Sequence, residues 1–237
     1  PSRLNLTRVR IAQDRYSDAR NNLEKMLKDT PSDGNVMLEQ ARLEQIEGNV
    51  DDARRWAKSA VEELNNELEP RIFLLELYLK QGDSDEAERL ARDTVTVFNE
   101  SLESTTLLGQ VLARVGKLGD AKFIYSRMSK EVGFDSDALY KVALLQLELQ
   151  DYRAAQHSLY KALQSNPDHL PATVAIIDTY IALEEYDTAI ELAQKSKQRF
   201  AGRAQWDALS GAAYFRKGDI ANAESAYRRA TALSESS

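Results

Sequence analysis

The chain has 237 residues, of which 43% are hydrophobic and 29% are charged, and its formal net charge is −7 at pH 7. This acidic balance leaves no basic stripe that could neutralise phosphates, so we expect no nucleic-acid partner. No run approaches the roughly 20 consecutive apolar residues that a membrane-spanning helix needs, so we expect no direct membrane insertion of this segment. The absence of cysteine excludes disulfides and thiolate metal sites.

Alanine recurs every 34 residues along the whole chain, at Ala19, Ala53, Ala87, Ala121, Ala155, Ala189 and Ala223. A fixed period of this length indicates stacked copies of one supersecondary unit, which is the signature of a solenoid. We number the repeat so that this alanine is position 20. The sequence then predicts one array, covering residues 1–237, made of seven repeats: 1–33, 34–67, 68–101, 102–135, 136–169, 170–203 and 204–237.

A tight turn precedes each of these alanines, and helical patterns flank it on both sides. In chain order the turns lie at residues 14–16, 48–50, 82–84, 116–118, 150–152, 184–186 and 218–220. Four of them carry glycine, which ends a helix by adopting a left-handed conformation. Asp14, Gln150 and Glu184 stand there instead, so we expect either ordinary backbone angles or local strain at these three turns. Each repeat is therefore predicted to read helix A, turn, helix B and loop, with helices of about 12 to 15 residues.

Small side chains mark where the two helices of a repeat approach each other. Alanine at position 20 has a packing reason, since a larger side chain would hold helix B away from helix A. Pro31 and Pro167 fall at position 32, where a helix B should have ended. An ordinary helical bundle, the alternative fold, would not enforce this equal spacing.

These features resemble the tetratricopeptide repeat family, and the resemblance covers the whole chain. The family pattern is met in the last repeat by Gly211, Tyr214, Ala223, Tyr227 and Ala230, and in the fifth by Ala143, Ala155, Leu159, Ala162 and Pro167. Arg10 and Glu44 depart from it, because position 11 is normally aromatic, and no repeat has Trp at position 4. The resemblance implies an all-α, right-handed superhelical solenoid of about seven 34-residue helix-turn-helix repeats.

The resemblance also implies where a partner would bind, because helix A lines the concave groove of such arrays. The candidate groove residues are Arg8, Arg42, Glu76, Gln110, Tyr140, Leu144, Leu147, Val174, Asp178, Ile181 and Phe215. The charged members come early, and the last three repeats contribute an apolar stretch that is typical of a contact site. The alternative is that these side chains only pack against neighbouring repeats. The family's clamp for a C-terminal carboxylate is missing, since Leu4 and Arg8 stand at positions 5 and 9 where it needs Lys and Asn.

Catalytic and metal-binding patterns are weak. His157 is expected on a solvated helix face, and His169 in the following loop beside Asp168, with no third metal ligand at a suitable spacing. No phosphate loop, nucleophile elbow or paired-carboxylate motif is present. We therefore expect no enzyme activity, no metal and no cofactor.

The leading functional hypothesis is a non-catalytic scaffold that binds a peptide or protein segment. The Gly-Asp turns are also similar to those of bacterial tetratricopeptide lipoproteins of exopolysaccharide and PEP-CTERM protein-sorting systems, which implies a periplasmic or outer-membrane-anchored full-length protein rather than a cytoplasmic one. Two alternatives stay open: a regulatory or substrate-recruiting arm of a larger enzyme, and a carbohydrate-binding surface that uses Tyr140, Trp206, Tyr214 and Phe215.

The two ends of the chain carry expectations of their own. The chain starts at Pro1 without Met, and its first repeat lacks an opening position, so we expect a fragment of a longer protein. The last repeat ends without a polar capping helix. Further repeats are therefore expected after it, or self-association through the array ends.

Overall fold

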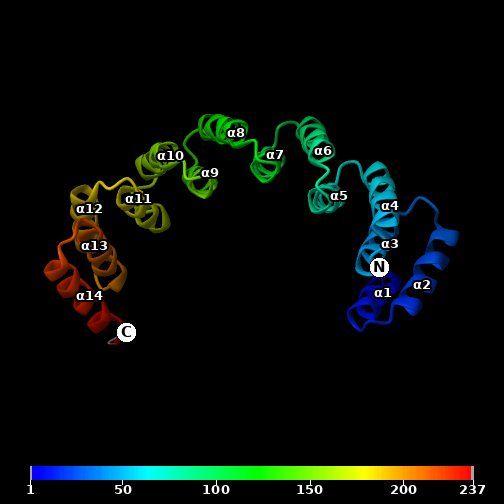
Figure 1. The fold of residues 1–237 in the computed structure, drawn as a ribbon, viewed down its shortest axis with the longest axis horizontal. Coiled ribbons are helices and arrows are strands. Elements are labelled where there is room, and N and C mark those ends of the chain that lie inside the picture. Colours follow the sequence, from blue (N-terminus) through cyan, green and yellow to red (C-terminus); the bar gives the residue numbers. More distant parts are fainter. Residues whose placement is uncertain (1, 236–237) are drawn as a thin grey trace. The chain divides into compact units, whose positions relative to one another are not determined.

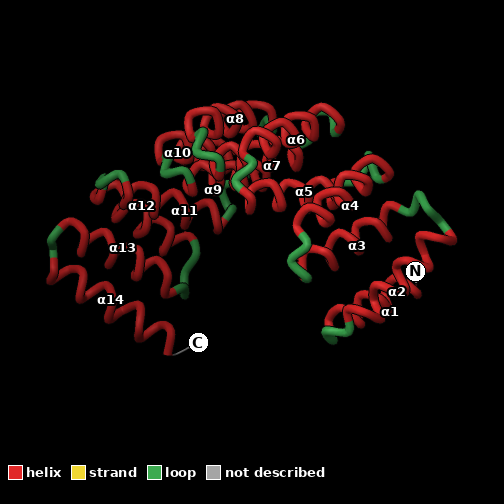
Figure 2. The backbone as a smooth tube through the Cα atoms, turned by 45° about the vertical axis from the view of Figure 1, so that its right-hand side comes forward, coloured by secondary structure: helices red, strands yellow, loops and turns green. Residues whose placement is uncertain are grey.

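The computed structural model describes residues 2–235, and every regular element in this range is an α-helix (Figure 2). Pro1 and residues 236–237, at the outer limits of the first and last predicted repeats, lie outside the described residues. The helices are α1 Ser2–Ala12, α2 Tyr16–Asp29, α3 Gly34–Ile46, α4 Val50–Glu63, α5 Leu68–Gln81, α6 Ser84–Val97, α7 Leu102–Arg114, α8 Leu118–Glu131, α9 Ser136–Glu148, α10 Tyr152–Ser165, α11 Leu170–Ala182, α12 Tyr186–Arg199, α13 Ala204–Lys217 and α14 Ile220–Glu235.

Helix starts recur with the 34-residue period. The odd-numbered helices from α3 to α13 begin at the first residue of each predicted repeat, and every even-numbered helix begins at position 17. The odd helices are therefore the predicted A helices and the even ones the B helices. Pro31 and Pro167 lie just beyond α2 and α10, as expected for a residue that cannot continue a helix.

The chain divides into two compact units, residues 1–121 and 122–237, with the division inside α8. Within each unit, consecutive helices pack against one another, and some A helices also contact the next A helix, as α5 does α7 and α11 does α13. Figure 1 shows the A helices α9, α11 and α13 along one side of the second unit and the B helices α10, α12 and α14 along the other. No helix within residues 2–235 combines the length and the apolar character needed to cross a bilayer.

The residue between helix A and helix B is left-handed in all seven turns. Gly48, Gly82, Gly116 and Gly218 have φ between 77° and 89°, while Asp14, Gln150 and Glu184 have φ of 58°, 54° and 61°. The expectation of ordinary backbone angles at these three residues is therefore wrong. The alternative, local backbone strain, agrees with their positive φ.

Helix capping explains this conformation. The amide that follows the left-handed residue reaches back to a carbonyl in the last turn of helix A, as in the 2.9 Å bonds from Asp151 N to Gln146 O and from Glu185 N to Tyr180 O. This closure needs φ > 0 at the intervening residue, whatever its side chain. A non-glycine residue then carries a cost of roughly 1–2 kcal/mol.

The seven alanines at position 20 are all buried. In the second unit, Ala155 and Ala189 belong to an apolar core built around Leu159, Ile176, Ile177 and Trp206. The two helices of the last repeat approach closely at Gly211, where an added Cβ would lie 2.9 Å from the Tyr227 ring. The family's pairing of a small residue at position 8 with an aromatic at position 24 thus has a direct steric cause here.

Glu44, a departure from the family pattern, is buried in an ionic cluster instead of an aromatic core. Its carboxylate accepts hydrogen bonds from Arg20 Nη1 at 2.6 Å, Gln40 Nε2 at 2.7 Å and Asn49 Nδ2 at 2.8 Å. The Arg20 hydrogen bond, opposed by burial, lowers the pKa of Glu44. Arg20 also binds Glu47, so one guanidinium of the first repeat pairs with two carboxylates of the second.

Candidate partner-binding surface

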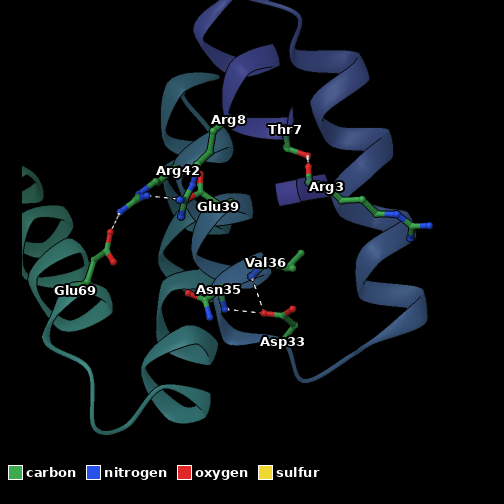
Figure 3. Close-up of polar contacts among 9 residues, drawn as sticks. All are labelled: Arg3, Thr7, Arg8, Asp33, Asn35, Val36, Glu39, Arg42 and Glu69. Atoms are coloured by element: carbon green, nitrogen blue, oxygen red, sulfur yellow. Dashed lines mark hydrogen bonds and ion pairs between the residues drawn. The ribbon is translucent and has the colours of Figure 1, made fainter. Parts of the chain in front are cut away.

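The first unit neutralises the charges that were expected in its groove (Figure 3). The buried carboxylate of Glu39 accepts from Arg8 Nε at 2.8 Å and from Arg42 Nη1 at 2.7 Å. Arg42 then reaches Glu69 at 2.5 Å, so the chain of ion pairs runs across α1, α3 and α5. Arg8 and Arg42 therefore hold neighbouring A helices together rather than presenting free charge.

The remaining candidates of the first unit are Glu76 and Gln110. Glu76 is half-buried and forms an ion pair with Arg114, which links α5 to α7. Gln110 is exposed on α7. Most of the charge on the A helices of this unit is thus committed within the protein.

The A helices of the second unit present apolar side chains. Leu144 on α9 is 38% exposed and Phe215 on α13 is 59% exposed. The other four apolar candidates are partly buried and pack against the core of this unit: Tyr140, Leu147, Val174 and Ile181. For these four, packing between repeats accounts for much of the side-chain surface, which leaves Leu144 and Phe215 as the apolar groups open to a partner.

Asp178 and Ile181, both predicted groove residues on α11, line a cavity of about 390 Å³. The other lining residues are Tyr152, Ala182, Glu184, Tyr186 and Arg216. Asp178 is exposed and forms no ion pair or hydrogen bond with any described residue, although neighbouring protein atoms limit its contact with water. This desolvation raises the pKa of Asp178.

His169 has a structural role. Its Nδ1 accepts a hydrogen bond from the Ala172 amide at 3.1 Å, which caps the start of α11, and its Nε2 lies 3.0 Å from Oδ1 of Asp137. Since Nδ1 is an acceptor, Nε2 carries the proton and donates it to the carboxylate. Tyr140 packs on the same imidazole, with 5.0 Å between ring centroids. His157, by contrast, is exposed on α10, and no cluster of three or more potential metal ligands occurs within residues 2–235.

Trp206 cannot serve a carbohydrate-binding surface, so this part of the prediction is wrong. Its side chain is fully buried, its Nε1 donates to the Phe200 carbonyl at 3.0 Å, and its ring stacks on Phe200. A ring enclosed on both faces has no surface left for a sugar. Tyr214 also packs against the core.

Two ion pairs at equivalent repeat positions, each with one buried and one partly exposed member, were missed by the sequence analysis. Arg71 at position 4 binds Asp93 at position 26, at 2.6 Å. In the last repeat the same positions carry the opposite charges, and Asp207 binds Arg229 at 2.9 Å. Asp207 also binds Lys197 of the preceding repeat. Opposite charges recurring at positions 4 and 26 were the signal that could have found these pairs.

Three models described as tetratricopeptide repeat match residues 4–67, 146–213 and 208–237, which together make up more than half of the chain. The comparison with curated proteins found no match.

Solved structures share the fold at low sequence identity. A tetratricopeptide repeat protein from Parabacteroides merdae ATCC 43184 is 12% identical with a TM-score of 0.52, over 98% of this chain and 92% of that chain. Naa15/Naa10 bound to HypK-THB is 16% identical with a TM-score of 0.54, over 95% of this chain and 36% of the matched chain. A crystal structure of MamA is 21% identical with a TM-score of 0.49, over 69% of this chain and 95% of that chain. The first two of these likenesses, together with the helices of the structure, confirm the predicted all-α solenoid, and the three family models show that the chain belongs to the tetratricopeptide repeat family.

Proposed function

We propose that this protein is a non-catalytic scaffold whose A helices in residues 122–235 bind a segment of a partner protein. The observation that carries the proposal is the exposure of Leu144 and Phe215 on A helices, with the unpaired charges of Asp178 and Arg216 on the helices α11 and α13. Apolar groups rimmed by uncommitted polar groups are typical of contact surfaces.

The first unit supports the same assignment by contrast. Arg8, Arg42 and Glu76 are held in ion pairs, and a partner would have to break these pairs before using their charges. An extended or helical segment would meet fewer obstacles on α9, α11 and α13.

A peptide-display experiment tests the proposal. Random linear peptides are selected on the wild-type chain, and the binders are titrated by calorimetry against Leu144→Asp/Phe215→Asp. We expect at least about tenfold weaker binding, because two apolar contacts are replaced by charges that must be desolvated. The matched control is Phe123→Asp/Phe134→Asp, which changes two exposed aromatic residues outside the A helices.

The outcomes are separable. Both double variants should keep the helical circular dichroism of the wild type, since all four side chains are exposed. A failure to select any binder, or equal weakening in the two double variants, would contradict the assignment of the site. Loss of helicity in Leu144→Asp/Phe215→Asp alone would show these side chains to be core residues.

We also propose that the scaffold works in a bacterial envelope system for exopolysaccharide export or protein sorting. Support comes from the Gly-Asp turns, such as Gly82-Asp83 and Gly218-Asp219. The full-length gene tests this proposal: a signal peptide followed by a lipobox cysteine upstream of Pro1 would support it, and an uninterrupted cytosolic N-terminal region would contradict it.

A further inference from the structure

The 390 Å³ cavity of the second unit is lined by residues of three repeats, from the A helices α11 and α13, the starts of the B helices α10 and α12, and the turn between α11 and α12. Asp178, Ile181 and Ala182 come from α11, and Arg216 comes from the last turn of α13. Tyr152 and Tyr186 are the first residues of the B helices α10 and α12. Its volume is near the lower end of the roughly 300–1,000 Å³ found for small-ligand sites, which suits a single long side chain.

The charged groups of this cavity are uncommitted, although their sequence neighbours are paired. Glu185 binds Arg153 at 2.7 Å, and Lys217 binds Asp187 at 2.5 Å. One residue away, Glu184 and Arg216 form no ion pair with any described residue, and neither does Asp178. The lining therefore offers two free carboxylates against one free guanidinium.

Two tyrosine rings and two carboxylates form a surface suited to a cation. Carboxylates bind guanidinium groups through charge-assisted hydrogen bonds, and tyrosine faces attract cations. We propose that this cavity receives the guanidinium side chain of an arginine in the segment bound by the A helices; the inference rests on the proposed function. Arg216 then has donors available for a backbone carbonyl of the same segment.

The electrostatics favour a cation over an anion as the occupant. A bound guanidinium would meet two carboxylates and only one like charge, whereas a bound carboxylate would meet two like charges and only one opposite charge. The alternative occupant to be tested is therefore an anionic side chain bound by Arg216.

The test titrates the ¹⁵N-labelled full chain with N-acetyl-arginine N-methylamide and follows the backbone amides by NMR. We expect saturable shifts concentrated in residues 178–186, with binding at least about fivefold weaker in Asp178→Asn, since a charge-assisted hydrogen bond is lost. The equivalent citrulline compound, which has the same shape without the charge, should give no such shifts. Glu191→Gln is the matched control, because Glu191 is an exposed carboxylate of the same repeat outside the cavity.

Each other outcome overturns the inference. Equal shifts with citrulline, or no saturable shifts with the arginine compound, would remove the guanidinium site. Binding of N-acetyl-glutamate N-methylamide that is lost in Arg216→Gln would show an anion site. The inference fails alone if selected peptides still depend on Leu144 and Phe215 while the arginine compound does not bind. The proposed function fails alone if the arginine compound binds but no peptide depends on Leu144 and Phe215.

Discussion

The two units differ in how the candidate groove residues of their A helices use charge. In the first, Arg8, Glu39 and Arg42 form ion pairs that join successive A helices. In the second, the A helices expose Leu144 and Phe215, and the charges of the cavity between α11 and α13 are left without partners. Charge that stabilises the stacking of repeats is not available to a ligand. We therefore propose a structural role for the first set of A helices and partner recognition for the second.

The two units also differ in the polarity of their buried residues. The first unit places Glu44 at position 11, where the last repeat has Tyr214, and supplies the counter-charge from Arg20 of the preceding repeat. The second unit has a continuous apolar core around Ile176 and Ile177. The repeat therefore tolerates either solution at a core position, provided that the neighbouring repeat supplies the matching partner.

The largest expected effect comes from breaking the ionic core of the first unit. Arg20→Ala leaves the buried Glu44 without its cation and should cost about 2–3 kcal/mol, measured by urea denaturation. This is below the roughly 3–5 kcal/mol typical of fully buried pairs, because the Arg20 side chain is 33% exposed. The double variant Arg20→Met/Glu44→Met should recover to within about 1.5 kcal/mol of wild type, since no charge is left unpaired. Equal losses in both variants would show that packing, not charge, dominates at this site.

A larger side chain in the apolar core of the second unit should lower the stability of the fold by overpacking. Ala155→Leu forces a larger side chain between helices α9 and α10 and is expected to cost about 1–3 kcal/mol. Ala221→Leu, an exposed alanine on α14, is the control and should change stability by less than about 0.5 kcal/mol. An unchanged melting temperature for Ala155→Leu would contradict close packing at position 20.

Exchanging the polarity of an ion pair tests whether the two units are interchangeable at positions 4 and 26. Arg71→Asp should destabilise, and adding Asp93→Arg should restore about 1 kcal/mol by rebuilding the arrangement of Asp207 and Arg229. Recovery should be partial, because Val61 occupies the position that Lys197 has beside Asp207. Adding Val61→Lys should therefore improve it further. A double variant no more stable than Arg71→Asp would show that the two sites are not equivalent.

The turns should respond more weakly. Gln150→Gly removes a left-handed non-glycine residue and is expected to stabilise by about 0.5–1 kcal/mol in thermal unfolding. Asp14→Gly should gain less, because the Asp14 carboxylate accepts a 2.7 Å hydrogen bond from Tyr16 and aspartate tolerates this conformation. A loss of stability in Gln150→Gly would rule out strain at this turn.

The smallest effects concern pH, and they should have opposite signs in the two units. The lowered pKa of Glu44 means that its stabilisation is present above the unfolded-state pKa and is lost as pH falls through the folded-state pKa. The raised pKa of Asp178 means that ionisation costs the folded state free energy, so stability from this group rises as pH falls. Unfolding midpoints of wild type, Glu44→Gln and Asp178→Asn, measured between pH 3 and 7, check both directions. If the stability difference from wild type changed with pH in the same direction for both variants, the comparison would be contradicted.

The helices and turns could be predicted from the sequence because they recur with one 34-residue period. Alanine, glycine and proline report backbone and packing needs that recur in every repeat, so the helices and their starts follow from spacing. The conformation of Gln150 did not follow from its side chain, since the capping hydrogen bond of helix A imposes it. The pairing of Arg20 with Glu44 depends on how two successive repeats pack. The cavity at Asp178 depends on the volumes of side chains from three repeats, which spacing alone does not encode.

The reversed ion pairs at positions 4 and 26 constrain how this gene could have been rearranged. Each pair lies within one repeat, with one member on helix A and the other on helix B. Duplicating or exchanging whole repeats keeps both members together. A crossover at the turn between the third and seventh repeats would join Arg71 to Arg229, or Asp207 to Asp93, and would leave a buried charge facing a like charge instead of its counter-ion. Repeat boundaries, rather than the turns inside repeats, are therefore where recombination between these two copies would yield folded descendants.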